Sequence, residues 1–295
     1  HTRGAFLMAL FAKEFGFKNL FVPKDSANEA AAIKGINVYP VKNLTQICQH
    51  LAGQEQISPV DHNQVPIEVG LRTAEFDMKE VLGQEQAKRA LEIAAAGGHN
   101  IIMIGSPGSG KTMLARALPG ILPPLNDAES LEVTKIYSAA GNIPPGGSLI
   151  TTRQFRAPHH TASLPGVVGG GSKPQPGEIS LAHRGVLFLD EFNEFGRSIL
   201  EAMRQPLEDG RVTISRARQR TDYPADFMLV ASANPCPCGY AMHPKKNCVC
   251  SQNQIVKYQK RISGPILDRI DLHIAVMPVD TAEFSDNQKG SEFLE

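Results

Sequence analysis

The stretch Gly105-Ser-Pro-Gly-Ser-Gly-Lys-Thr112 decides the fold of this chain. It follows an apolar run over 100–104 and precedes a helical pattern over 113–118. This order of strand, glycine-rich loop and helix is the context that a phosphate-binding loop requires. Glycines let backbone N–H groups curl around a polyphosphate without side-chain clashes, and a helix N-terminus favours negative charge. The residues expected to bind a nucleoside triphosphate are Gly105, Ser106, Pro107, Gly108, Ser109, Gly110, Lys111 and Thr112.

Four side chains are expected to act on the bound nucleotide. Lys111 is expected to reach the β- and γ-phosphates, and Thr112 to hold Mg²⁺. A continuous apolar run over 185–191 ends in Asp190 and Glu191, as in a buried parallel strand whose C-terminal end faces a ligand. We expect Asp190 to complete the Mg²⁺ shell and Glu191 to polarise the attacking water. The alternative is a solvated acidic strand end.

Two further polar residues stand beside apolar runs. Asn234 follows the run over 227–231 and could contact the γ-phosphate or the water, although Asn ends many strands. Arg269 leads into the last apolar run and could reach a neighbouring subunit's ATP as an arginine finger. The alternative for Arg269 is a structural ion pair with Asp268 or Asp271.

Composition sets outer limits on the function. A length of 295 residues favours two domains, or one large domain and a fragment of another. The 30 basic and 30 acidic residues cancel, so any surface for nucleic acid must be local. No apolar stretch has the length of a membrane span, and we expect no membrane partner. Five clustered cysteines are too few for a disulfide scaffold, and an ATP-using motor is expected in the cytoplasm.

The order of patterns along the chain predicts its domains. An opening α/β segment shows helix, strand, helix, strand and helix patterns in turn. A Gly- and Pro-rich stretch over 141–180 is typical of functional loops. The expected parts are the end of a preceding domain over 1–57, a linker over 58–70, a nucleotide-binding core over 71–280 and a polar tail over 281–295.

Several motifs resemble an AAA+ ATPase of the magnesium-chelatase-like group and, more narrowly, the ComM/YifB family. Besides the phosphate-binding loop, they include Leu187-Phe-Leu-Asp-Glu-Phe192, Phe155-Arg-Ala-Pro-His-His-Thr-Ala162, Asn234-Pro-Cys-Pro-Cys-Gly239 and Leu267-Asp-Arg-Ile-Asp271. The resemblance covers roughly 71–280, and the opening piece is similar to the end of that family's Lon-protease-like domain.

The resemblance implies an α/β AAA+ core with a five-stranded parallel sheet flanked by helices, and β-hairpin inserts. It implies a homo-hexamer that hydrolyses ATP between subunits and promotes branch migration of DNA during natural transformation, with single-stranded or branched DNA as partner. Arg269 matches the finger that acts on the next subunit. The family's C-terminal helical lid is expected to be absent from residues 1–295. Two other functions stay open: a chelatase-type motor that remodels a protein or inserts a metal, and a non-enzymatic, ATP-gated assembly module.

The cysteines carry a second chemical signal. Cys236, Cys238, Cys248 and Cys250 form two Cys-x-Cys pairs, and four thiolates can close a tetrahedral Zn²⁺ site. The usual zinc knuckle has two residues between its cysteines, so four reduced thiols in an irregular loop are the alternative. His243 could replace one ligand. Cys48 is expected to be a small buried residue.

Local positive charge is the signal for DNA. Residues 227–267 contain no Asp or Glu, and two segments, 211–214 and 219–222, predict a β-hairpin. Clustered arginines there fit contacts with phosphates, and a solvated face is the alternative. The arginines concerned are Arg211, Arg216, Arg218 and Arg220.

Overall fold

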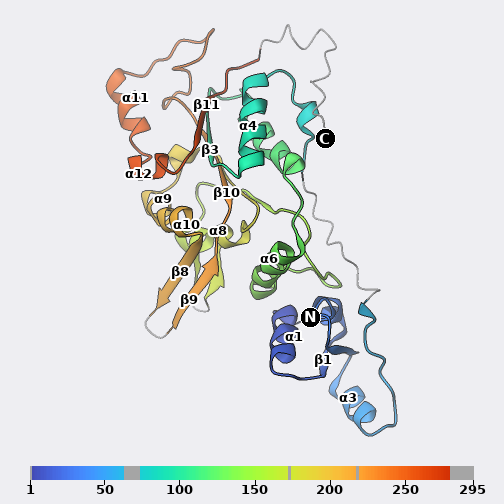
Figure 1. Ribbon diagram of the computed structural model, residues 1–295. Coiled ribbons are helices and arrows are strands. Elements are labelled where there is room, and N and C mark those ends of the chain that lie inside the picture. The colour runs from blue at the N-terminus through green and yellow to red at the C-terminus, as the bar shows by residue number, and fades with distance from the viewer. Residues whose placement is uncertain (1, 63–73, 172–173, 217–218, 280–295) are drawn as a thin grey trace. The chain divides into compact units, whose positions relative to one another are not determined.

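The computed structural model describes residues 2–62, 74–171, 174–216 and 219–279 (Figure 1). The chain forms two compact units. One consists of 1–71 and 124–152, and the other of 72–123 and 153–295. No helix among the described residues has the length and apolar character needed to cross a membrane. The expected tail over 281–295 and most of the expected linker over 58–70 lie outside the described residues.

The first unit is a small α/β body built on two parallel strands, β1 and β2, which pair from Asn19↔Asn37 to Pro23↔Val41. Its core is formed by Phe6, Val22, Val38 and their neighbours. The elements are α1 (Ala5–Glu14), β1 (Asn19–Pro23), η1 (Lys24–Ser26), α2 (Ala27–Ala31), β2 (Asn37–Val41), α3 (Leu44–Leu51) and α6 (Asp127–Ala140). The helix and strand patterns predicted in the opening segment are therefore present.

Helix α6 belongs to this first unit, although it comes after the phosphate-binding loop in the chain. The buried carboxylate of Glu29 ties it in place, because Oε1 accepts hydrogen bonds from Phe6 N at 3.1 Å and from Ser138 Oγ at 2.6 Å. A capping box at Asn126 and Glu129 begins the helix. The range 71–280 therefore contains a segment, 124–152, that packs with the opening residues.

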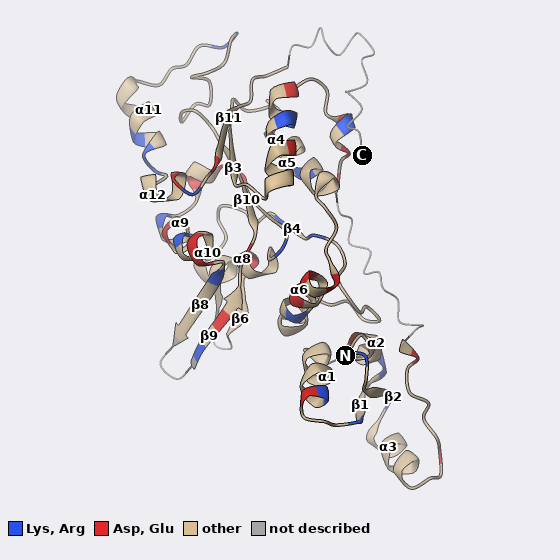
Figure 2. Cartoon of the chain, viewed as in Figure 1, with Lys and Arg blue, Asp and Glu red and all other residues tan. Residues whose placement is uncertain are grey.

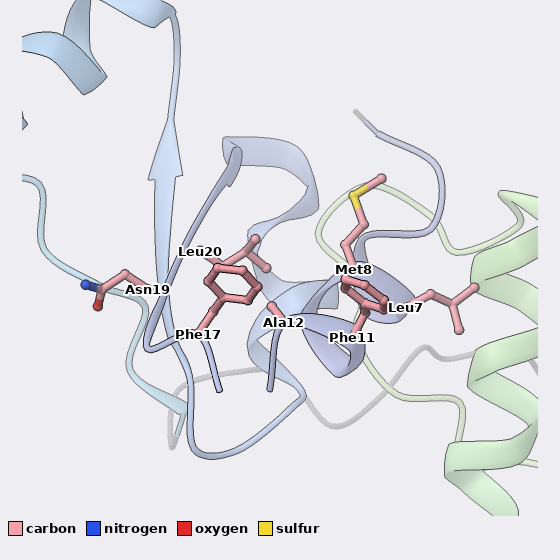
Figure 3. Close-up of a pocket in the computed structure, with 7 residues that line it drawn as sticks. All are labelled: Leu7, Met8, Phe11, Ala12, Phe17, Asn19 and Leu20. Carbon is pink, nitrogen blue, oxygen red and sulfur yellow. The ribbon is translucent and has the colours of Figure 1, made fainter. Parts of the chain in front are cut away.

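The first unit also carries an apolar hollow beside α1 (Figure 3). Phe11 and Phe17 line it and are each more than half exposed. Phe11 stacks on Phe15, with ring centroids 4.2 Å apart. Phe15 is also exposed, at 67% of its surface, so the three rings form an exposed aromatic group on this unit.

The second unit is built on a five-stranded parallel sheet with the strand order β11-β3-β10-β7-β4. Its strands are β3 (Ile101–Ile104), β4 (Phe155–Arg156), β7 (Val186–Leu189), β10 (Met228–Ala233) and β11 (Leu272–Ala275). This confirms the predicted α/β core with five parallel strands.

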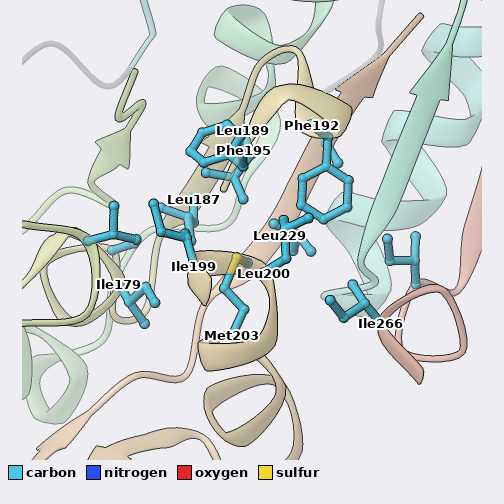
Figure 4. Packing of buried hydrophobic residues seen from close by; sticks show 14 of the residues in the cluster. Ile179, Leu187, Leu189, Phe192, Phe195, Ile199, Leu200, Met203, Leu229 and Ile266 are labelled. Atoms are coloured by element: carbon cyan, nitrogen blue, oxygen red, sulfur yellow. The ribbon is translucent and has the colours of Figure 1, made fainter. Parts of the chain in front are cut away.

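Helices cover both faces of the sheet, which explains why its central strands are almost continuously apolar rather than alternating. On one face, α4 (Glu85–Gly97) and α5 (Lys111–Ala117) pack Leu91 and Leu114 against Met103. On the other face, α9 (Arg197–Ala202) and α12 (Gly264–Leu267) bring Leu200 and Ile266 to Leu187 and Leu229 (Figure 4).

Part of the stretch expected to be loops is ordered structure. Strand β4 forms an edge of the sheet, and Arg156 holds it with a bidentate ion pair to Glu178 at 2.6 and 2.7 Å. A two-residue strand has too few residues to show a periodic pattern, so the sequence did not predict it. The other elements there are α7 (Leu164–Val168), β5 (Gly169–Gly170), β6 (Gln175–Pro176) and α8 (Glu178–Leu181).

The apolar residues Ile199, Leu200, Met203 and Leu207 have helical spacing, which predicts one helix over 198–207, but the structure divides it into α9 and α10 (Arg204–Asp209). Pro206 has no N–H to donate to the preceding turn, and this ends the continuous helix. Beyond α10, β8 (Arg211–Arg216) and β9 (Gln219–Pro224) pair antiparallel over six residues each, which confirms the predicted hairpin. The remaining elements are η3 (Met78–Glu80), η4 (Leu118–Ile121), η5 (Phe192–Glu194) and α11 (Gln252–Gln259).

Candidate nucleotide site

The glycine-rich loop joins the carboxyl end of β3 to the start of α5. Gly105 N donates to Ala233 O at 3.1 Å, and a Cβ atom at Gly105 would lie 2.2 Å from Val276 O. Only glycine therefore fits between the neighbouring strands. Gly108 and Gly110 have φ values of 78° and 90°, a left-handed conformation that glycine adopts without a steric cost.

Lys111 is buried and turned into this loop. Its Nζ donates to Gly105 O at 2.7 Å and to Ser106 O at 2.9 Å. Burial lowers the pKa of the Lys111 amine, and the negative charges of Asp190 and Glu191 oppose that change. The ammonium group thus lies in a partly desolvated position where its attraction for an anion is stronger than in water.

The loop fits a polyphosphate. The hydroxyls of Ser106 and Ser109 are buried, and within the described part of the chain neither has a hydrogen-bond partner. Buried hydroxyls are normally bonded, so these two offer hydrogen-bonding capacity to a ligand. Together with the loop amides and the Lys111 ammonium, they suit the negatively charged oxygens of a nucleoside triphosphate.

Asp190 directly follows β7 and contacts α5, the helix that begins at the end of the phosphate-binding loop. Its Oδ2 accepts a hydrogen bond from Thr112 Oγ1 at 2.9 Å, and its Oδ1 accepts from Ser232 Oγ at 2.5 Å and Glu191 N at 3.0 Å. The structure therefore brings together the two residues that were predicted to hold Mg²⁺. Ser232 was not predicted, although its single hydroxyl in the apolar run of β10 was a signal for it.

Glu191 occupies a strained position beside a histidine. Its φ of 52° is left-handed, which costs a non-glycine residue on the order of 1–3 kcal/mol. Its Oε2 lies 3.2 Å from His160 Nδ1. Strands β4 and β7 are neighbours, so the segment after β4 meets the end of β7. The sequence did not predict this contact because it did not predict β4.

Asn234 and Gln84 complete the surroundings of the loop. Asn234 is half-buried and directly follows Ala233, whose carbonyl oxygen accepts the hydrogen bond from Gly105 N. Gln84, which was not predicted, directly precedes α4 with a φ of 63° and donates from Nε2 to Ser109 O at 3.0 Å. A Gly-Gln pair just before a helical pattern was the available signal for Gln84.

Arg269 lies at the opposite end of the sheet from the loop of its own chain. Its backbone oxygen accepts a hydrogen bond from Asn100 Nδ2 at 2.9 Å, and Asn100 precedes β3 whereas the loop follows it. The four residues of β3 span about 13 Å. The structure therefore does not bring Arg269 to the site formed by the other predicted residues.

The ion pair of Arg269 differs from the predicted alternatives. Its guanidinium pairs with Glu208 at 2.9 Å, not with Asp268 or Asp271. Asp271 instead accepts a hydrogen bond from Asn100 N at 2.9 Å. The pair with Glu208 is about half exposed, and such pairs hold a side chain only weakly.

The structure brings together the sulfur atoms of Cys236, Cys238, Cys248 and Cys250. Their sulfur atoms all lie within 4.8 Å of one another, and Cys236 is buried. His243 does not join them, since its Nδ1 accepts from the backbone N–H groups of Lys245 and Lys246 at 3.0 Å. The prediction of a buried Cys48 is wrong: this thiol is exposed on α3.

Of the four hairpin arginines, the structure describes the side chains of Arg211 and Arg220, and these share the hairpin with a carboxylate. Arg211 and Arg220 are exposed, but Arg220 Nε lies 3.9 Å from Asp222 Oδ1, and Figure 2 shows both charges on this hairpin. Arg216 pairs in register with Gln219, and Arg218 lies outside the described residues. Val212 and Ile214 anchor the hairpin to the core.

A phosphate-binding loop beside an acidic strand end, in a parallel sheet of this order, defines the nucleotide-binding core of an AAA+ type protein. The family pattern described as "Magnesium chelatase, subunit ChlI" matches residues 77–284. The chain therefore belongs to the magnesium-chelatase family, within its ComM/YifB group.

Three relatives illustrate the comparison. "Competence protein ComM" of Haemophilus influenzae is 45% identical over 91% of this chain and 52% of its own length. "Uncharacterized protein YifB" of Escherichia coli is 44% identical over 92% and 52%. "Magnesium-chelatase 38 kDa subunit" of Rhodobacter capsulatus is 29% identical over 54% and 50%. The chain spans about half the length of these curated relatives.

Proposed function

We propose that the full-length protein is an ATP-driven, hexameric motor in the cytoplasm that promotes branch migration of DNA during natural transformation. The observation that carries ATP hydrolysis is the meeting of Thr112, Asp190 and Glu191 beside the phosphate-binding loop. The DNA substrate is supported by the relative named as a competence protein, which is 45% identical to this chain.

Each residue has a distinct role in the proposed reaction. Thr112 and Asp190 would hold Mg²⁺, which neutralises charge on the β- and γ-phosphates when it is bound. Lys111 pairs with the same phosphates, and Glu191 orients and polarises the attacking water. Asn234 supports that water from the end of β10.

The position of Arg269 supports catalysis between subunits. Because it lies beyond the amino end of β3, it cannot serve the site at the carboxyl end of the same strand. The weak pair with Glu208 leaves it free to change partner. In a ring, each Arg269 could face the next subunit's nucleotide. It would then act away from its own site and exchange Glu208 for a phosphate partner.

DNA-stimulated ATP hydrolysis tests this function against the two alternatives. We expect single-stranded or branched DNA to raise the ATPase rate of the full-length protein several-fold over a DNA-free control. A chelatase-type motor, suggested by the relative named as a magnesium-chelatase subunit, should not respond to DNA. An assembly module should bind ATP with no turnover under any of these conditions.

The hairpin is the proposed DNA contact, and its arginines give a further prediction. Replacing Arg211 and Arg220 together by Ala should weaken DNA binding and flatten its salt dependence, with a decrease in slope of about 1.4–1.8 for two lost phosphate contacts. Basal ATP hydrolysis should persist. Fluorescence anisotropy across a salt titration measures both quantities.

A matched control removes two surface arginines elsewhere. Arg89 and Arg204 each pair with a glutamate three residues away in the chain, and the double alanine variant should bind DNA with an unchanged slope. If the hairpin variant behaves like this control, the hairpin is not the contact.

A further inference from the structure

The loop between β10 and α11 contains the four clustered cysteines and few other features that could fix its conformation. All of residues 234–251 are described, and they contain no helix or strand. Cys236 is buried, whereas Val249 is 85% exposed. A loop of this length with so few buried apolar side chains needs another source of order.

The spacing of the sulfur atoms matches a metal site. Cys236 Sγ lies 3.4 Å from Cys238 Sγ and 3.7 Å from Cys248 Sγ, and the last two are 3.6 Å apart. Zinc–sulfur bonds of about 2.3 Å in a regular tetrahedron separate the sulfurs by about 3.8 Å. A disulfide would bring two of them to about 2 Å.

Backbone N–H groups surround the sulfurs as they do around metal-bound thiolates. Ala241 N donates to Cys236 Sγ at 3.3 Å, and the backbone of Tyr240 and Val249 bonds to the Cys238 thiol. Such donors orient the ligands and offset negative charge on the sulfur. Four thiols at these distances, all within 4.8 Å, leave room for one ion and not for a multi-iron cluster.

The same loop begins next to the nucleotide site and contacts it through Gly239. Cys236 follows Asn234 by two residues. Gly239 has a φ of 81°, and a Cβ atom there would lie 2.5 Å from Cδ of Pro107 in the phosphate-binding loop. The other end of the loop is tied to α11, where Gln259 Nε2 donates to Pro235 O at 3.2 Å.

We propose that Cys236, Cys238, Cys248 and Cys250 bind one structural Zn²⁺, and that the loop closed by this ion supports the phosphate-binding loop through the contact of Gly239 with Pro107. The zinc has no open coordination position and takes no part in the reaction. Its effect on the nucleotide is mechanical, because an unclosed loop cannot hold Gly239 against Pro107.

Zinc content is the first test and does not depend on ATP hydrolysis or on DNA. Full-length protein purified without chelator should contain about one zinc per chain, the stoichiometry of a four-thiolate site, by mass spectrometry of its metals. Cys238→Ser should lose most of the zinc, and Cys238→His, which keeps a zinc ligand, should retain it. Cys48→Ser is the matched control, since Cys48 lies outside the cluster, and should keep full zinc content.

Nucleotide affinity is the second test. It distinguishes the support of the phosphate-binding loop by Gly239 from the metal site itself. Gly239→Ala should keep its zinc and yet bind a fluorescent ATP analogue several-fold more weakly than the parent protein, because the added methyl group displaces Pro107. Cys238→Ser should show the same loss together with loss of zinc. If Cys238→Ser does not fold, wild-type zinc content decides the metal site, and Gly239→Ala decides the support.

Three results would overturn the proposal. The metal site is refuted by protein without zinc in which all four thiols react freely with a thiol reagent, or by protein that contains iron instead. The support is refuted if Gly239→Ala binds the nucleotide analogue as tightly as the parent protein does. A failure of DNA stimulation would leave both of these measurements unaffected.

Discussion

Lys111→Ala should reduce ATP hydrolysis by the full-length protein to background. Its ammonium is the only buried cation among the described residues of the phosphate-binding loop, and loss of one such preorganised group typically slows turnover by about 100- to 1000-fold. Glu191→Gln should instead keep nucleotide binding and stop turnover, because the amide cannot polarise water. Steady-state hydrolysis and binding of a fluorescent ATP analogue distinguish the two defects.

Two control variants with the same kind of substitution make this result specific. Lys79→Ala removes an exposed lysine that pairs with Asp77, and Glu194→Gln changes a carboxylate that pairs with Arg261. Both should hydrolyse ATP near the parental rate. Normal hydrolysis by Glu191→Gln would show that another residue polarises the water.

Arg269→Ala should fold and bind nucleotide but lose about 1000-fold or more in turnover, the effect of removing an arginine finger. The loss of its exposed pair with Glu208 should cost at most about 1 kcal/mol of stability. Glu208→Ala is the matched control, because it breaks the same ion pair and leaves the guanidinium in place. This variant should retain hydrolysis.

Mixing subunits tests whether Arg269 acts across an interface. An Arg269→Ala subunit retains Glu191, and a Glu191→Gln subunit retains Arg269, so mixed rings contain some interfaces with both groups intact. Hydrolysis should therefore recover in part when the two inactive proteins are combined. Absence of recovery in rings shown to contain both subunits would contradict a finger acting in trans.

The parts of the site that the sequence predicted are those fixed by neighbouring residues in the chain. The glycine-rich loop needs its strand before it and its helix after it, and both are local, so Lys111 and Thr112 could be placed at the start of that helix. Asp190 was predictable because it ends a long apolar run. The meeting of Thr112 with Asp190 follows from the rule that ligands bind at the carboxyl ends of parallel strands.

The contacts that escaped prediction depend on which strands become neighbours. His160 reaches Glu191 only because the two-residue β4 pairs with β7. Helix α6 joins the first unit through Glu29, which is 109 positions away in the chain from Ser138. Sequence spacing contains no record of such distant partners, and a two-residue strand is too short to reveal its place.

The separation of Arg269 from the phosphate-binding loop along β3 has a genetic consequence. In the proposed ring, each subunit contributes its phosphate-binding loop to one catalytic centre and its Arg269 to another. Neither centre is complete without the neighbouring subunit. A subunit without Arg269 would then also inactivate the nucleotide site of the normal subunit next to it. A cell that makes equal amounts of Arg269→Ala and normal protein should retain well under half of its transformation frequency, and the mutation should behave as dominant.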